Sequence, residues 1–128
     1  MRTLILLFGF LLVLTSCEKE VFELSEDVSI GHHSSILIQT ENSGQIDVKY
    51  AQLLDESRCP PDATCIWTGF VKIQLKLNNK EFVELGLGET TVDSVAYNDH
   101  VIKLLAVEYD SDEDFGVEKK SSVVIRVD

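Results

Sequence analysis

Two cysteines stand six positions apart in the middle of the chain, with two prolines between them. Cys59 and Cys65 are the only cysteines beyond the N-terminal region, where Cys17 is the third. A cysteine pair in an exported chain is expected to oxidise to a disulfide. Pro60 and Pro61 fix φ and remove two backbone donors, so this segment cannot continue a helix or strand. We therefore predict a short loop closed by a Cys59–Cys65 disulfide, which stabilises the fold by roughly 2 kcal/mol.

Other cysteine chemistries fit the spacing less well. A zinc site takes four ligands, usually with about two to four residues between paired cysteines, and the chain has no second pair. A thioredoxin-like redox pair is Cys-x-x-Cys, which is absent. Two free thiols are the alternative if the chain is not exported.

Three aspartates alternate along one acidic stretch, at Asp110, Asp112 and Asp114. Calcium loops use such spacing because alternate side chains converge on one ion. An EF-hand loop would place glycine where Phe115 stands and glutamate where Ser121 stands. The stretch is therefore either a weak calcium site or a solvated hairpin loop.

The remaining residues that could do chemistry form no recognisable catalytic set. His32 and His33 are adjacent, so on a strand they would face opposite sides and could not easily share a metal, which favours surface or edge histidines. His100 is expected to begin a strand. The chain has no Gly-x-Ser-x-Gly motif and no glycine-rich phosphate loop. We therefore predict no catalytic residue and no cofactor.

Arg58 and Trp67 flank the cysteine pair. We expect Arg58 to order the loop through an ion pair with Asp55, Glu56 or Asp62, and anion binding is its alternative role. Trp67 is expected to pack over the disulfide, as large aromatic side chains cover small cores. Its alternative role is an exposed binding platform.

The stretch reads Asp-x-x-Arg-Cys-Pro-x-x-x-x-Cys-x-Trp-x-Gly. It resembles the signature of a widespread group of small secreted or lipid-anchored bacterial proteins, and the similarity covers about residues 45–128. The resemblance implies a strand, this loop and further strands, and it implies no chemistry. The group usually has Asp-Ser-Arg-Cys-Pro, whereas Glu56 is an extra residue here, which leaves the role of Asp55 open. The structural motif residues are Asp55, Arg58, Pro60, Trp67 and Gly69.

The first residues are typical of a bacterial secretion signal. An apolar run at 4–14 follows one arginine and is shorter than the roughly 20 residues that span a bilayer. Leu14-Thr15-Ser16-Cys17 resembles a bacterial lipobox. That resemblance implies a diacylglycerol on the Cys17 sulfur, cleavage before Cys17 and acylation of its new amine. In that family an Asp after the cysteine retains proteins in the inner membrane. Glu18 therefore favours the outer membrane, on its periplasmic face or the cell surface.

Without residues 1–16 the chain has 10 basic and 22 acidic residues, a formal net charge of −12. Such a surface repels nucleic acid and anionic lipid. It favours cationic partners or divalent ions, although acidic surfaces also simply keep proteins soluble. We expect no nucleic-acid partner.

Short strand patterns separated by turns must position these residues. Residues 71–77 alternate apolar and polar side chains, as do 46–50 and 123–127. Leu53 and Leu54 break the alternation, which indicates a β-bulge. Asn78-Asn79 predicts a hairpin turn, 101–109 a central strand, and 91–97 either a strand or a helical turn. The chain is thus predicted to be all-β, an antiparallel sandwich or small barrel of six to eight strands.

We divide the chain into a signal peptide at 1–16, an acidic tether at 17–27 with a short edge strand, and a β-sandwich domain at 28–128. The favoured function is a lipid-anchored binding module of the cell envelope. Its ligand, a small molecule or an envelope protein, would meet loops 59–65 and 110–120 at one end of the sandwich. An accessory subunit of an outer-membrane complex and an envelope hydrolase are the alternatives.

Overall fold

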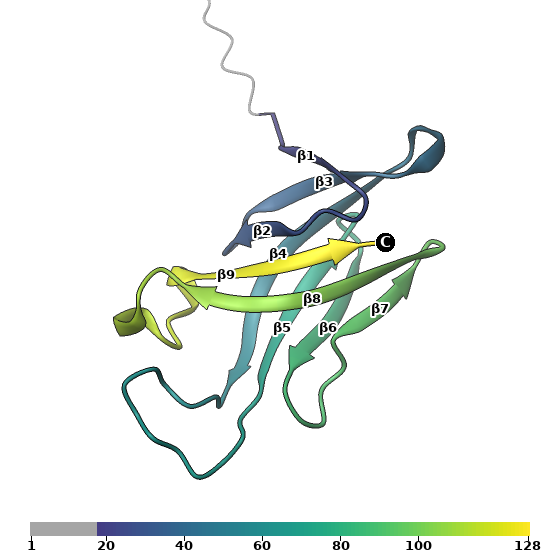
Figure 1. The fold of residues 1–128 in the computed structure, drawn as a ribbon. Helices are drawn as coiled ribbons and strands as arrows, with labels where there is room; N and C mark the ends of the chain where they lie inside the picture. Colours follow the sequence, from purple (N-terminus) through teal and green to yellow (C-terminus); the bar gives the residue numbers. More distant parts are fainter. Residues whose placement is uncertain (1–17) are drawn as a thin grey trace, which may run out of the picture.

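A computed structural model describes residues 18–128, which form nine strands in two sheets (Figure 1). The strands are β1 (Val21–Glu23), β2 (Val28–Gly31), β3 (Ser35–Gln39), β4 (Gln45–Glu56), β5 (Val71–Leu77), β6 (Glu81–Leu87), β7 (Ser94–Tyr97), β8 (His100–Tyr109) and β9 (Ser121–Val127). Three single 3₁₀ turns are η1 (Glu41–Ser43), η2 (Asp112–Asp114) and η3 (Glu118–Lys120). One sheet has the order β1-β3-β4-β5-β6 and the other β2-β9-β8-β7.

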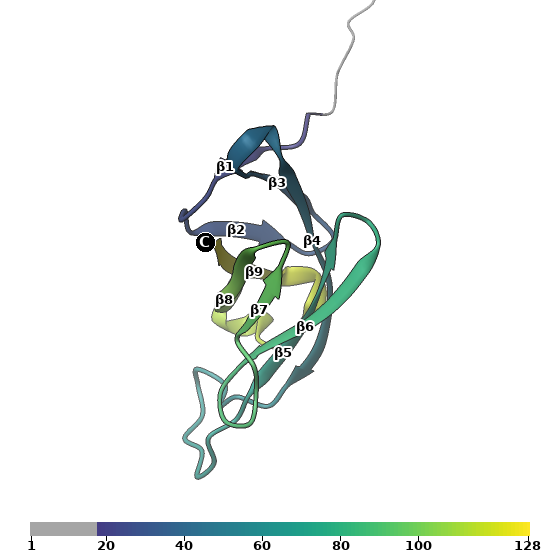
Figure 2. The same cartoon turned by 90° about the vertical axis from the view of Figure 1, so that its right-hand side faces the viewer.

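The fold is an all-β sandwich, as the sequence predicts. Every strand pairing is antiparallel except β1 with β3. The two sheets lie face to face in the side view (Figure 2). Nine strands form instead of six to eight, because β1, β2 and β7 have only three or four residues each. The ambiguous 91–97 stretch contains β7.

Alternation along the strands builds the core. In β5 and β9 every second residue is buried, so each strand turns one apolar face inward. The buried apolar side chains of both sheets form a single cluster. A polar pair joins the sheets inside it, where the Tyr50 hydroxyl lies 2.7 Å from Ser121 Oγ. This pairing satisfies both hydroxyls away from solvent.

The predicted irregularities are present. The β4–β5 register shifts between Tyr50 and Gln52 and again between Leu53 and Asp55, so β4 is bulged. Asn78 and Asn79 take φ of 50° and 56° and turn the chain between β5 and β6. Both are asparagines, which tolerate left-handed backbone better than most residues. β8 is an inner strand of its sheet, as predicted for 101–109.

The N-terminal described residues are held against the first sheet. β1 is the edge strand expected within 17–27 and pairs with β3. Lys19 Nζ forms an ion pair with the buried carboxylate of Asp47. Within 18–128 there is no helix with the length and apolarity to cross a bilayer. The predicted signal peptide and Cys17 lie outside the described residues.

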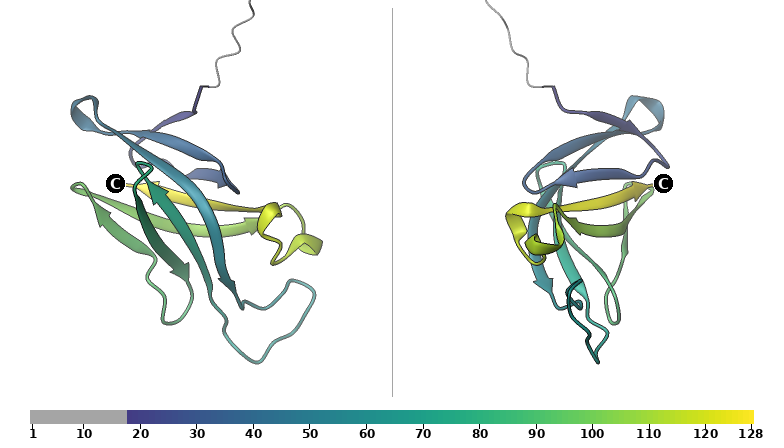
Figure 3. Two further views of the ribbon diagram at one scale, coloured as in Figure 1. Left: turned by 180° about the vertical axis from the view of Figure 1, so that it is seen from behind. Right: turned by 60° about the vertical axis from the view of Figure 1, so that its left-hand side comes forward.

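The topology brings two long loops to one end of the sandwich. Residues 57–70 join the end of β4 to the start of β5, and 110–120 join the end of β8 to the start of β9. Figures 1 and 3 show both loops at the same end of the sandwich, away from the β3–β4 and β7–β8 turns. The sandwich thus positions the disulfide loop and the acidic loop beside each other.

Candidate functional site

The disulfide loop is closed at its base by Ser57, Gly69 and Phe70. The Ser57 N–H and Oγ both donate to the Phe70 carbonyl, at 2.9 and 3.1 Å, and the Phe70 N–H donates to Ser57 Oγ at 3.1 Å. A Cβ on Gly69 would overlap the Ser57 carbonyl oxygen. Glycine is therefore required where the two chains of the loop cross so closely. This geometry explains Gly69 in the motif.

The loop contains the predicted Cys59–Cys65 disulfide, with Cα atoms 5.7 Å apart. Pro60 opens a turn in which its carbonyl accepts from the Ala63 N–H at 3.1 Å. Trp67 is 57% exposed and does not cover a core, contrary to our expectation. The reason is that the loop extends beyond the sheets, and the indole N–H instead donates to the Ser57 carbonyl at 3.0 Å.

A charged network joins the loop to β8. The Glu56 carboxylate accepts from Arg58 Nε at 2.9 Å, Arg58 Nη2 at 2.7 Å and the Arg58 backbone N–H at 3.1 Å. It also accepts from the Tyr109 hydroxyl at 2.7 Å. Arg58 Nη2 further donates to the Val107 carbonyl at 3.1 Å. Glu56 is thus the ion-pair partner of Arg58, whereas Asp55 is exposed and forms no ion pair within 18–128.

The protonation states follow from these contacts. Burial raises the pKa of Glu56, but hydrogen bonds from Arg58 and Tyr109 together outweigh it and hold that pKa below its ordinary value. The hydrogen bond to Glu56 raises the pKa of Arg58. Burial and the hydrogen bond to Glu56 raise the pKa of Tyr109. At neutral pH the network therefore consists of a carboxylate, a guanidinium and a neutral phenol that donates.

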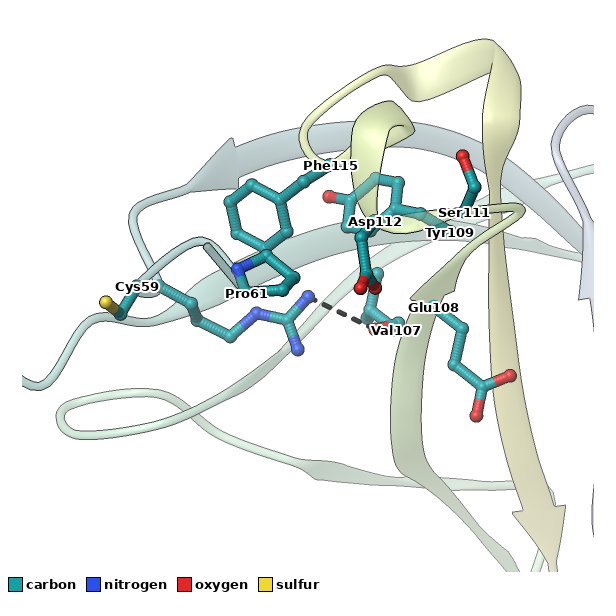
Figure 4. A pocket seen from close by; sticks show the side chains of 9 residues that line it. Cys59, Pro61, Val107, Glu108, Tyr109, Ser111, Asp112 and Phe115 are labelled. Atoms are coloured by element: carbon teal, nitrogen blue, oxygen red, sulfur yellow. Dashed lines mark hydrogen bonds between the residues drawn. The ribbon is translucent and has the colours of Figure 1, made fainter. Parts of the chain in front are cut away.

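A pocket of about 320 Å³ opens above this network. Its walls come from the disulfide loop and from β8 with the acidic loop (Figure 4). The disulfide loop contributes Arg58, Cys59 and Pro61 to the lining. β8 contributes Val107, Glu108 and Tyr109, and the acidic loop contributes Ser111, Asp112 and Phe115. Loops 59–65 and 110–120 therefore line one pocket, and the binding of a ligand there stays a prediction.

The pocket combines aromatic walls with negative charge. The Tyr109 and Phe115 rings lie 5.3 Å apart and the Arg58 guanidinium carbon lies 6.0 Å from the Phe115 centroid. Arg58 is neutralised by Glu56, which leaves Glu108 and Asp112 as the uncompensated charges at the lining. Such a surface can hold the apolar part of a ligand and a positive group at once.

The carboxylates of the three alternating aspartates do not converge on one point in the described residues, and a calcium site there stays a prediction without structural support. Asp112 and Asp114 lie in the 3₁₀ turn η2, where every second side chain points in a different direction. Asp114 Oδ2 instead accepts from Ser111 Oγ at 2.8 Å. Asp110, Asp112 and Asp114 belong to no group of converging metal ligands between residues 18 and 128.

The histidine prediction is wrong in its geometry. His32 and His33 lie in the turn after β2, not on a strand, and their rings stack with centroids 3.8 Å apart. The turn forms because His33 takes a left-handed backbone with φ of 61°. His100 begins β8 as expected.

Sequence reasoning missed Tyr109 and Phe115, which complete the pocket from the far side. Tyr109 ends β8 and Phe115 follows it in the acidic loop. Nothing in the local sequence links either residue to Arg58, which stands some 50 positions earlier.

No protein-family model, no curated protein and no solved structure matches the chain.

Proposed function

We propose that this chain is a lipid-anchored binding module of the bacterial cell envelope that captures a basic peptide segment in the pocket between its two long loops. The observation that carries the proposal is that pocket, with aromatic walls over a charged network. The anchor is Cys17, from the lipobox resemblance. The two loops that line the pocket lie at one end of the sandwich, away from the β3–β4 and β7–β8 turns (Figure 1).

Three pocket groups supply the recognition chemistry. Phe115 offers an aromatic face for the aliphatic stem of a lysine or arginine side chain. Asp112 is exposed at the lining and offers a carboxylate to the positive group. Arg58 Nη1 has no hydrogen-bond acceptor among the described residues, so it can donate to a peptide carbonyl.

The fixed network favours a preformed site. Both carboxylate oxygens of Glu56 hold Arg58, and the disulfide closes the loop that carries it. A site that is ordered before binding loses less conformational entropy when the ligand arrives. Ile66 is fully exposed and Trp67 largely so, and exposed apolar residues on the same loop support a protein ligand.

The test compares labelled peptides of equal length that carry lysine or glutamate at the centre. Fluorescence anisotropy should show a preference for the lysine peptide, and Asp112→Asn should weaken its binding about 10-fold, the loss of one charge-assisted contact. Asp99→Asn is the matched control, because Asp99 lies in the β7–β8 turn at the other end of β8. Equal binding of both peptides, or equal loss in both variants, would contradict the proposal.

A second function, as an accessory subunit of an outer-membrane complex, is favoured by one feature. β6 is an edge strand, and Phe82 on it is 57% exposed. Sheet edges with exposed aromatic residues are sites of strand addition and partner contact. A stoichiometric partner that co-purifies from solubilised envelopes and is lost in Phe82→Glu, but kept in Asp112→Asn, would support this function over the first.

A further inference from the structure

A second cluster of polar side chains lies at the turn between β2 and β3, and none of its members lines the pocket between the two long loops. The His32 N–H donates to the Ser121 carbonyl at 3.2 Å, and the His33 N–H donates to the Tyr50 carbonyl at 3.0 Å. The turn is therefore fixed to both sheets. The His32 ring is also packed edge-on against Tyr50, with centroids 5.6 Å apart.

Glu118 completes the cluster from η3. Its Oε1 lies 2.7 Å from His32 Nε2, and its Oε2 accepts from the Leu53 N–H at 3.3 Å. The His32 side chain is only 11% exposed and that of Glu118 37%, whereas His33 faces solvent. One donor atom from each of His32, His33 and Glu118 lies within 4.8 Å of the other two.

We propose that His32, His33 and Glu118 form a binding site for a divalent transition-metal ion, with Zn²⁺ the closest match. Two imidazoles and one carboxylate are donors that Zn²⁺ takes, whereas Ca²⁺ takes oxygen ligands only. With metal–ligand bonds of about 2.0–2.1 Å, tetrahedral ligand atoms stand about 3.3 Å apart. The His32–Glu118 contact of 2.7 Å would have to open by only about 0.6 Å.

An ion pair between His32 and Glu118 does not account for the whole arrangement. It leaves out His33, whose ring stacks on His32 at an interplanar angle of 26°. A metal ion would use the donor atoms of all three side chains, including that of His33.

The site is open on one side. Three protein ligands leave the fourth tetrahedral position for water or an added ligand. The Leu53 N–H holds one oxygen of Glu118, which orients the other toward the histidines. The acidic character of the whole chain, with a formal net charge of −11, draws cations to this surface.

The experiment is isothermal titration of the full chain in detergent, without a polyhistidine tag and after EDTA treatment, with ZnCl₂ at pH 7.5. We expect one Zn²⁺ per chain. His33→Ala and Glu118→Gln should each weaken Zn²⁺ binding at least about 10-fold. Removing a residue that only supports a metal ligand already costs about that much, so removing a ligand should cost no less. Binding should also weaken below about pH 6, because ligating histidines must be deprotonated.

His100→Ala is the matched control, since His100 is the third histidine and lies outside the cluster. It should bind Zn²⁺ like the unmodified chain. His33 is exposed, so its removal should leave the fold intact, which circular dichroism checks. The proposal is overturned if no Zn²⁺ binds, if both cluster variants bind like the unmodified chain, or if His100→Ala loses binding equally.

Discussion

Replacing Glu56 by glutamine should destabilise the domain more than any other single change of a carboxylate to an amide. The Glu56 side chain is only 7% exposed and accepts four hydrogen bonds, three from Arg58 and one from Tyr109. An amide keeps one acceptor oxygen, so the two bonds at that oxygen become neutral-acceptor bonds. At the other position an NH₂ group faces both Arg58 Nη2 and the Tyr109 hydroxyl, so the bond from Nη2 is lost and the NH₂ group can only donate to the Tyr109 oxygen.

The magnitude follows from these losses. A hydrogen bond to a charged group contributes about 1.5–3 kcal/mol, and a neutral one about 1 kcal/mol. The loss of the bond from Arg58 Nη2, together with the weakening of the two bonds at the remaining oxygen, should lower the free energy of unfolding by about 3 kcal/mol. Arg58 would also be left partly buried without its counter-charge, which points in the same direction. Since small domains have about 5–15 kcal/mol of stability in total, the effect is large.

Urea unfolding at pH 7, followed by circular dichroism, measures the difference. Asp55→Asn is the matched control, because Asp55 precedes Glu56 in β4 but is exposed. It should change the free energy of unfolding by less than about 0.5 kcal/mol. If Glu56→Gln and Asp55→Asn cost the same, the network does not hold the loop and our reasoning fails.

The same variant gives a pH test with a defined sign. The folded-state pKa of Glu56 is lowered from an ordinary value of 4.5. Its stabilising contribution is therefore complete above about pH 4.5 and is lost as the pH falls through the lower folded-state pKa. The advantage of the unmodified chain over Glu56→Gln should shrink in that acid range. An advantage that grows as the pH falls would refute the assigned direction.

Three further changes test the disulfide loop. Replacing both Cys59 and Cys65 by serine should lower the free energy of unfolding by roughly 2 kcal/mol in urea titrations, and reductant should then have no further effect. Gly69→Ala should lower the free energy of unfolding by more than about 2 kcal/mol, because the added Cβ would overlap the Ser57 carbonyl. Gly31→Ala is the control and should be nearly neutral in the same assay, because a Cβ on Gly31 meets only Ser34 Oγ at 3.6 Å. Trp67→Phe should lower the free energy of unfolding by about 1 kcal/mol, because it removes the indole hydrogen bond while the ring is largely exposed. A loss of about 3 kcal/mol or more would indicate that the ring is buried.

The regular part of the fold could be predicted because burial imposes a period of two on each strand. Residues 71–77 alternate without exception, and β5 buries every second residue. The bulge in β4 and the Asn78-Asn79 turn were likewise local signals. The short strand β2 was not predicted and β7 stayed ambiguous, because four residues are too few to show a period.

The partner of Arg58 could have been predicted more sharply than it was. Side chains two positions apart lie on the same side of an extended chain, so Glu56 was favoured over Asp55 by parity alone. The structure uses that relation, since Arg58 binds Glu56 through Nε and Nη2. Tyr109 could not be predicted in this way. Its place beside Glu56 depends on how the two sheets pack, which no spacing within the sequence records.

The acidic loop shows why composition was a poor guide to its role. Its alternating aspartates suggested a calcium site, yet the contacts to the rest of the fold come from other side chains, within the loop and at its ends. Tyr109 reaches Glu56 at the end of β4, Phe115 lies near Arg58 in the disulfide loop, and Glu118 reaches His32. The loop can serve both sites because the Asp110 N–H donates to the Lys120 carbonyl at 3.0 Å and holds its two ends together. A shortened loop that kept all its acidic residues would therefore lose both sites, whereas a loop with neutralised aspartates would keep the metal site and lose only the positive-group contact at Asp112.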